Sequence, residues 1–150
     1  MIAARSLRLF WPAIGLAAGV MSVSDGRTRQ AVATTTFAVS LAASLLAGVD
    51  WRVSFGLALA HVAAPWAFAV AVERFGCTIT RFGNHWQLVA YAGAAALGGL
   101  AGGIATAVSE RAIGATNAEM VSILWRTTAA DMVGIVLLAG AVGIGTRRLL

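Results

Sequence analysis

Five long apolar runs, separated by short polar connectors, constrain this chain more than any other feature of its sequence. Each run is close to the roughly 20 residues that a helix needs to cross the hydrocarbon core of a bilayer. The runs are uniformly apolar rather than alternating, which favours helices over the strands of a barrel. We therefore predict a single-domain, all-α integral membrane bundle of about five transmembrane helices. The expected helices cover residues 7–24, 30–48, 53–72, 85–109 and 118–145.

The composition supports a membrane environment. Only 11% of the 150 residues are charged and 59% are hydrophobic, whereas a soluble domain usually carries about 25% charged residues. All 11 basic residues are arginine, and the net charge is +5. In a soluble chain this charge would suggest nucleic-acid binding. Here the arginines mostly flank apolar runs, so membrane topology explains them better and no nucleic-acid partner is expected.

The arginines also favour one orientation in the bilayer. With five crossings, one side would hold Arg27, Arg29, Arg74, Arg81, Arg147 and Arg148, and the other Arg5, Arg8, Arg52 and Arg111. The richer side is expected to be cytoplasmic, which places the C-terminus in the cytoplasm. In the alternative, the first segment is not a true span, and four crossings leave both termini inside. Although the first segment resembles a signal peptide, we expect a retained helix.

Asp131 stands inside the last apolar run. A carboxylate in a membrane span costs about 2.5–3.5 kcal/mol on insertion scales, so it is a functional-site hypothesis by default. Arg126 is five residues away, about 140° around a helix, and cannot pair with it on one face. Arg126 is expected instead to reach the interface beside Trp125. His61, at comparable depth, is the first candidate partner of Asp131. The alternative is that His61 and Asp131 serve packing only.

Pro65 follows His61 by four residues within the third apolar run. Proline lacks the N–H that would bond the carbonyl of His61, so a kink is expected there. The kink would bring a carbonyl and an imidazole together near mid-membrane. That combination suits a ligand, a proton or a hydrogen bond between helices.

Several chemistries are not expected. The single cysteine, Cys77, excludes an intramolecular disulfide and a cysteine zinc site. Nucleotide-binding glycine motifs and the HExxH zinc motif are missing. His61 and His85 differ in expected depth by about 15 Å, at 1.5 Å per residue, which argues against haem held by both. We therefore expect no catalytic residues, no metal and no cofactor, and an enzyme is the least expected class.

Small residues recur at four-residue spacing on the first and fourth helices. Such stripes let helix backbones approach closely. Packing within the bundle is the main interpretation, and a homodimer through the fourth helix is the alternative. The residues concerned are Gly15, Gly19, Gly98, Gly99, Gly102 and Gly103.

Three stretches together resemble a known family: Phe10-Trp11-Pro12-Ala-Ile-Gly15, the glycine-rich 97–104, and the segment from Trp125 through Asp131 to Gly134. They are similar to the membrane-associated sensor (MASE) domain of the first type, found in bacterial histidine kinases and diguanylate cyclases. The resemblance spans about 10–140. Members usually have more membrane helices, and the proline that often follows the last motif is missing here.

The resemblance implies a sensory input module in a bacterial inner membrane. The module would detect a small ligand or a membrane partner and relay that event to a cytoplasmic output domain. The candidate ligand-binding or signalling residues are His61, Asp131, Arg126, Trp11, Pro12, Gly15, Trp125 and Gly134. One alternative is an accessory or structural subunit of a larger membrane complex. Another is a small transporter or channel, suggested by the intramembrane charges and by the hydroxyls of Thr34, Thr35, Thr36, Ser40 and Ser44 on the second helix.

Overall fold

The computed structural model describes residues 11–77 and 84–146, and all regular elements in these ranges are helical. The first two are α2 (Trp11–Val23) and α3 (Gly26–Leu46), followed by α4 (Trp51–Phe75) and α5 (His85–Arg111). The last helix has three parts, α6 (Asn117–Gly134), the π-helix η2 (Ile135–Ala139) and α7 (Gly140–Thr146). The all-α prediction is confirmed, while residues 7–10 of the expected first helix lie outside the described ranges.

Short polar side chains decide where four helices begin. Asp25, Asp50, Asn84 and Thr116 each accept a hydrogen bond from a backbone N–H of the following first turn, as helix N-caps do. Thr116 also completes a capping box with Glu119. Because Asp25 caps it, α3 begins at Gly26, four residues before the expected start, and its polar first turn belongs to the helix.

Three of the helices are long and apolar enough to cross a membrane: α4, α5 and the last helix from Asn117 to Gly145. The apolar part of α2, Pro12–Val23, is shorter than the roughly 20 residues that a span needs. The 21 residues of α3 include a charged first turn and several hydroxyls. A membrane protein with three candidate spans among the described residues is thus supported, whereas five spans remain a prediction.

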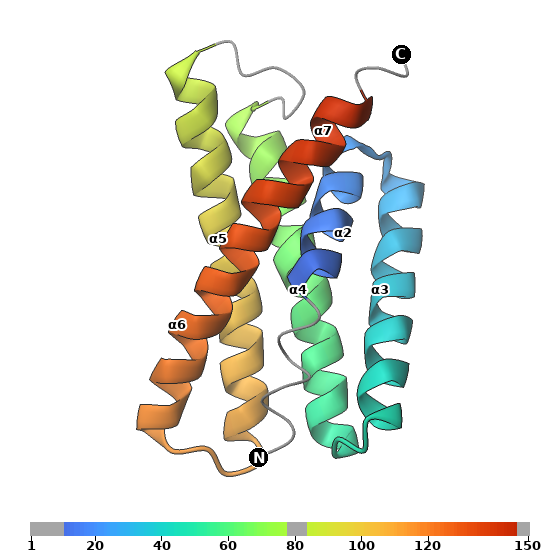
Figure 1. The fold of residues 1–150 in the computed structure, drawn as a ribbon, viewed down its shortest axis with the longest axis vertical. Coiled ribbons are helices and arrows are strands. Elements are labelled where there is room, and N and C mark those ends of the chain that lie inside the picture. The colour runs from blue at the N-terminus through green and yellow to red at the C-terminus, as the bar shows by residue number, and fades with distance from the viewer. Residues whose placement is uncertain (1–10, 78–83, 147–150) are drawn as a thin grey trace.

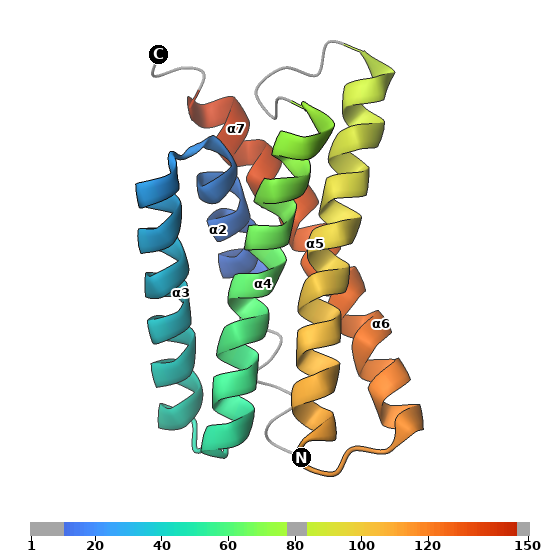
Figure 2. The same cartoon turned by 180° about the vertical axis from the view of Figure 1, so that it is seen from behind.

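The bundle is built around α4, which packs against α5, α3 and α2 (Figures 1 and 2). The last helix crosses the face of the bundle obliquely and packs against α5 along α6 (Figure 1). Further along, η2 and α7 pack against α2. The last helix therefore contacts both α2 and α5, which come from distant parts of the chain.

The core of the bundle is made largely of small residues. Alanines of α4 and α5 surround a few larger side chains, among them Phe68, Tyr91 and Ile135. Pro65 is buried within α4, which continues from Trp51 to Phe75 as one helix. Whether Pro65 kinks α4 stays a prediction. Small core residues bring the helix backbones close together, so a polar side chain on one helix lies against the backbone of the next.

Candidate functional site

Asp131 lies on the face of α6 that packs against α5. The residue is only 4% exposed, and a Cβ atom added to Gly102 of α5 would overlap its Oδ2 atom. Among the described residues, no hydrogen bond or ion pair involves the carboxyl group of Asp131. The structure thus buries this carboxyl group against the backbone of α5 without a polar partner among the described residues, and its functional role stays a prediction.

Thr128, one turn before Asp131, repeats this arrangement. The residue is 7% exposed, and its Oγ1 atom has no hydrogen-bond partner in the described part of the chain. This hydroxyl faces Gly103, where an added Cβ would overlap it. Two polar side chains of α6 are therefore buried side by side on the glycine surface of α5.

The glycines of α5 make this contact close. A Cβ added to Gly99 would lie 2.7 Å from the carbonyl oxygen of Thr128, and one added to Gly98 would lie 2.9 Å from that of Ala64. Both distances are too short for real carbon atoms, so any larger residue would force the helices apart. The glycines of α5 that the sequence singled out thus pack within the bundle, against both α4 and α6.

A second close contact joins α2 to the last helix. A Cβ added to Gly15 would overlap the backbone of Gly134, and one added to Gly19 would lie 2.9 Å from the Cα atom of Ala139. The opening motif and the final motif, far apart in the sequence, therefore meet through Gly15 and Gly134. Pro12 is half-buried near the start of α2, and the side chain of Trp11 lies outside the described part of the structure.

His61 pairs with α3 rather than with Asp131. Its Nδ1 atom lies 3.1 Å from the Oγ atom of Ser40. Ala64 of α4 faces Gly102 and Asp131, and His61, three residues earlier, is turned by about 60° from that direction. The expected His61–Asp131 hydrogen bond is therefore not formed, because helix rotation directs the imidazole toward α3.

Arg126 and Trp125 lie away from the buried contact. Both side chains are exposed, with Trp125 65% exposed. Arg126 lines an open groove of about 460 Å³ near the α5–α6 connector, together with Glu110 and Glu119. These positions agree with side chains that reach the membrane interface, and the structure does not bring Arg126 into the Asp131 contact.

Tyr91 is a site residue that the sequence analysis missed. Its hydroxyl donates to the carbonyl oxygens of Ile135 and Val136, each at 3.0 Å, in the π-helical part of the last helix. The ring packs edge-on against Phe68 with a centroid distance of 5.7 Å. The available signal was a lone tyrosine in an apolar run, since a buried phenol usually finds a partner.

Comparisons with protein-family models, with characterised proteins and with solved structures found no match to this chain. The resemblance to membrane-associated sensor domains therefore stays a prediction from the sequence. Within residues 11–77 and 84–146, no group of three or more histidine, cysteine, aspartate or glutamate side chains is placed to hold a metal ion.

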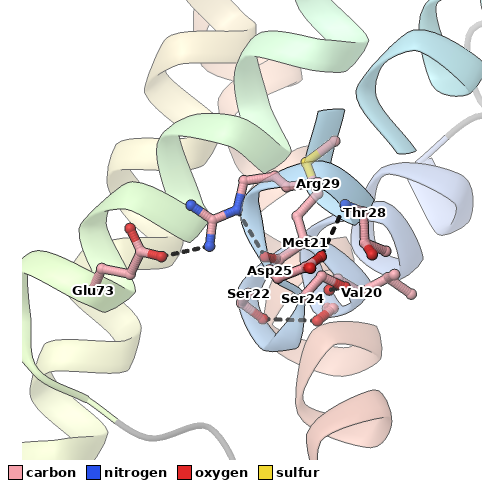
Figure 3. Close-up of polar contacts among 9 residues, drawn as sticks. Val20, Met21, Ser22, Ser24, Asp25, Thr28, Arg29 and Glu73 are labelled. Atoms are coloured by element: carbon pink, nitrogen blue, oxygen red, sulfur yellow. Dashed lines mark hydrogen bonds and ion pairs between the residues drawn. The ribbon is translucent and has the colours of Figure 1, made fainter. Parts of the chain in front are cut away.

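Arg29 is a second residue whose role the sequence analysis missed. Its Nε atom donates to the carbonyl oxygen of Met21 at 3.0 Å, and its Nη2 atom forms an ion pair with Glu73 (Figure 3). From the sequence, Arg29 was expected in the polar connector before the second apolar run. The structure instead places it in the first turn of α3, only 9% exposed, where it ties α3 to both α2 and α4.

Proposed function

We propose that this chain is a sensory input domain embedded in a bacterial inner membrane, with its C-terminal end in the cytoplasm. It would detect a small ligand or a membrane partner and relay that event to a cytoplasmic signalling output. The observation that carries this proposal is the burial of Asp131 without a partner among the described residues, on a helix that continues to Thr146.

Burying a polar group without a hydrogen bond is costly, and an acid within a membrane span is more costly still. Packing alone does not require it, because an apolar side chain of similar size would fill the same space. The cost is therefore better explained by a function that needs a polar group at the contact between α5 and α6.

The last helix offers a direct route from this contact to the end of the chain. Asp131 and Thr128 lie in α6, and the same helix continues through η2 into α7 without a loop. A change at the α5–α6 contact would shift the population between two packings of the last helix. An effector joined to the end of α7 would respond to that shift.

The test is Asp131→Asn in the chain joined after Leu150 to a diguanylate cyclase domain, with cyclic dinucleotide output measured in membranes. Removing the charge-bearing group from the contact should change the output at equal membrane insertion. Asp50→Asn, at the exposed cap of α4, is the matched control and should leave the output unchanged. Equal output from Asp131→Asn and the wild-type chain would remove Asp131 from the mechanism.

Extraction of the native protein in mild detergent separates this proposal from its main alternative. A mass well above 15.4 kDa for the denatured chain would support a cytoplasmic continuation. A chain of 15.4 kDa in a stable stoichiometric assembly would instead favour an accessory subunit of a larger complex.

A further inference from the structure

The last helix changes its hydrogen-bonding pattern between Asp131 and the end of the chain. Residues Ile135–Ala139 form the π-helix η2, with α-helix on both sides. π-helical residues make up well under 1% of residues in proteins, and short π segments occur frequently at functional sites. η2 follows the buried Asp131 contact by one turn.

Glycines of α2 hold one side of this segment. Gly15 lies against the backbone of Gly134, immediately before η2, and Gly19 lies against Ala139, its last residue. Ile135 and Ala139 are both fully buried. η2 is thus enclosed by neighbouring helices rather than left at a frayed end.

Tyr91 of α5 holds the other side. Its hydroxyl donates to the carbonyl oxygens of Ile135 and Val136, two groups whose usual helical bonding a π segment disturbs. Gly140 lies beside this hydroxyl, since a Cβ added there would be in ordinary van der Waals contact with its oxygen at 3.4 Å. A single side chain therefore bonds directly to the carbonyls of the irregular turn.

We propose that η2 is a register joint, that is, a segment whose conversion from π-helix to α-helix changes the register of the last helix and turns α7. The hydroxyl of Tyr91 holds it in the π form. A π segment accommodates one extra residue without changing the faces that the flanking helices present. If the segment becomes α-helical with that residue retained, everything after it must turn by roughly 100° and move by ~1.5 Å.

This inference deepens the proposed function, and its link to signalling rests on that proposal. The N–H of Ile135 donates to the carbonyl oxygen of Asp131, so the first π-helical residue is bonded to the candidate sensing residue. A displacement of Asp131 relative to α5 would reach η2 through one backbone bond. The joint would then convert a small local change into a rotation of α7.

Spin labels on the full chain test the joint directly. In a Cys77→Ala background, the substitutions Val39→Cys on α3 and Ile144→Cys on α7 carry the spin labels, and both positions are exposed. The distance between the two labels is measured by pulsed electron paramagnetic resonance. Tyr91→Phe keeps the ring and removes the hydroxyl, so it should shift this distance by several ångströms. Thr106→Val is the matched control, because it removes a buried hydroxyl of α5 that bonds only within its own helix.

Deletion of Leu137, an exposed residue of η2, is the second variant. It removes the extra residue, so a regular α-helix should present α7 as in the wild-type chain, and the distance should stay unchanged. An unchanged distance in Tyr91→Phe, or a shifted one after the deletion, would overturn the joint. If Tyr91→Phe does not fold by circular dichroism, the deletion decides alone. Neither distance depends on an output domain, so failure here is distinct from failure of the sensory proposal.

Discussion

Two regions of the bundle bury charged or polar side chains in opposite ways. At one end, Arg29 is 9% exposed, and it bonds to Met21 and Glu73 (Figure 3). Midway along the last helix, Asp131 and Thr128 are about as well buried, yet neither side chain bonds to a described residue. The first region joins three helices, while the second lies against bare glycine backbone.

Buried polar groups with and without partners contribute differently to stability. A buried charge with its partners in place fixes the orientation of the helices that supply them. A buried polar group without partners stabilises nothing by itself and costs free energy. Asp131 is therefore the better candidate for a functional residue. The most informative variants remove a partnered group, which should lower the free energy of unfolding, or an unpartnered group, which should raise it.

The largest expected effect is at the glycine surface. Gly99→Ala adds a Cβ that would lie 2.7 Å from the backbone of Thr128, and overpacking of this kind should lower the free energy of unfolding by about 2 kcal/mol or more. Gly93→Ala, on the same helix, meets only Phe75 at 3.6 Å. It should raise that free energy by up to about 1 kcal/mol, because alanine favours helix. Chemical unfolding in detergent measures both, and equal effects would contradict a close contact at Gly99.

The second-largest effect on the free energy of unfolding is expected from the removal of the Arg29 charge. Arg29→Gln removes the bonds to Met21 and Glu73 and should lower the free energy of unfolding by about 1–2 kcal/mol. Glu73 is 56% exposed, so the ion pair itself contributes little of this. Arg27→Gln, at an exposed position of the same turn, should have almost no effect. A matching loss in both variants would mean that total charge at this end matters more than the buried contacts.

The sequence predicted the helices well because their signals are local. Apolar runs indicate their approximate extents, but the start of α3 was placed four residues too late because the cap at Asp25 was not recognised. Asp131 was also identified from the sequence, since an acid in an apolar run is conspicuous anywhere. The residues that surround Asp131 could not be predicted, because the sequence of a uniformly apolar helix does not indicate which of its faces points toward the neighbouring helix.

Rotation explains the particular errors. His61 was expected to face Asp131 but faces Ser40 of α3, although Ala64, three residues on, does face that site. The π segment and its bond to Tyr91 were also missed. Ile135–Ala139 contains only residues that suit an ordinary helix, and a single inserted residue has no sequence signature of its own.

A smaller effect of opposite sign is expected from the unpartnered hydroxyl. Thr128→Val keeps the shape of the side chain and removes a buried group without a partner, so the free energy of unfolding should rise by about 1 kcal/mol. Thr106→Val removes a buried hydroxyl that bonds to the Gly102 carbonyl at 2.9 Å, and should lower it by about 0.5–1 kcal/mol. Destabilisation by Thr128→Val would show that its hydroxyl has a partner in the membrane.

The smallest effect concerns pH at the partnered end. Hydrogen bonds from Thr28 hold the pKa of the exposed Asp25 carboxyl below its usual value. Because the folded pKa is the lower one, the contribution of this cap to stability is complete above about pH 4 and is lost as the pH falls through the folded pKa. The thermal midpoint should therefore fall more between pH 5 and pH 3 (about one unit either side of that value) in the wild-type chain than in Asp25→Asn, whose amide oxygen still accepts the bond without titrating. Equal falls would mean that the α2–α3 turn, which also positions Arg29 against Met21, does not depend on the ionised cap.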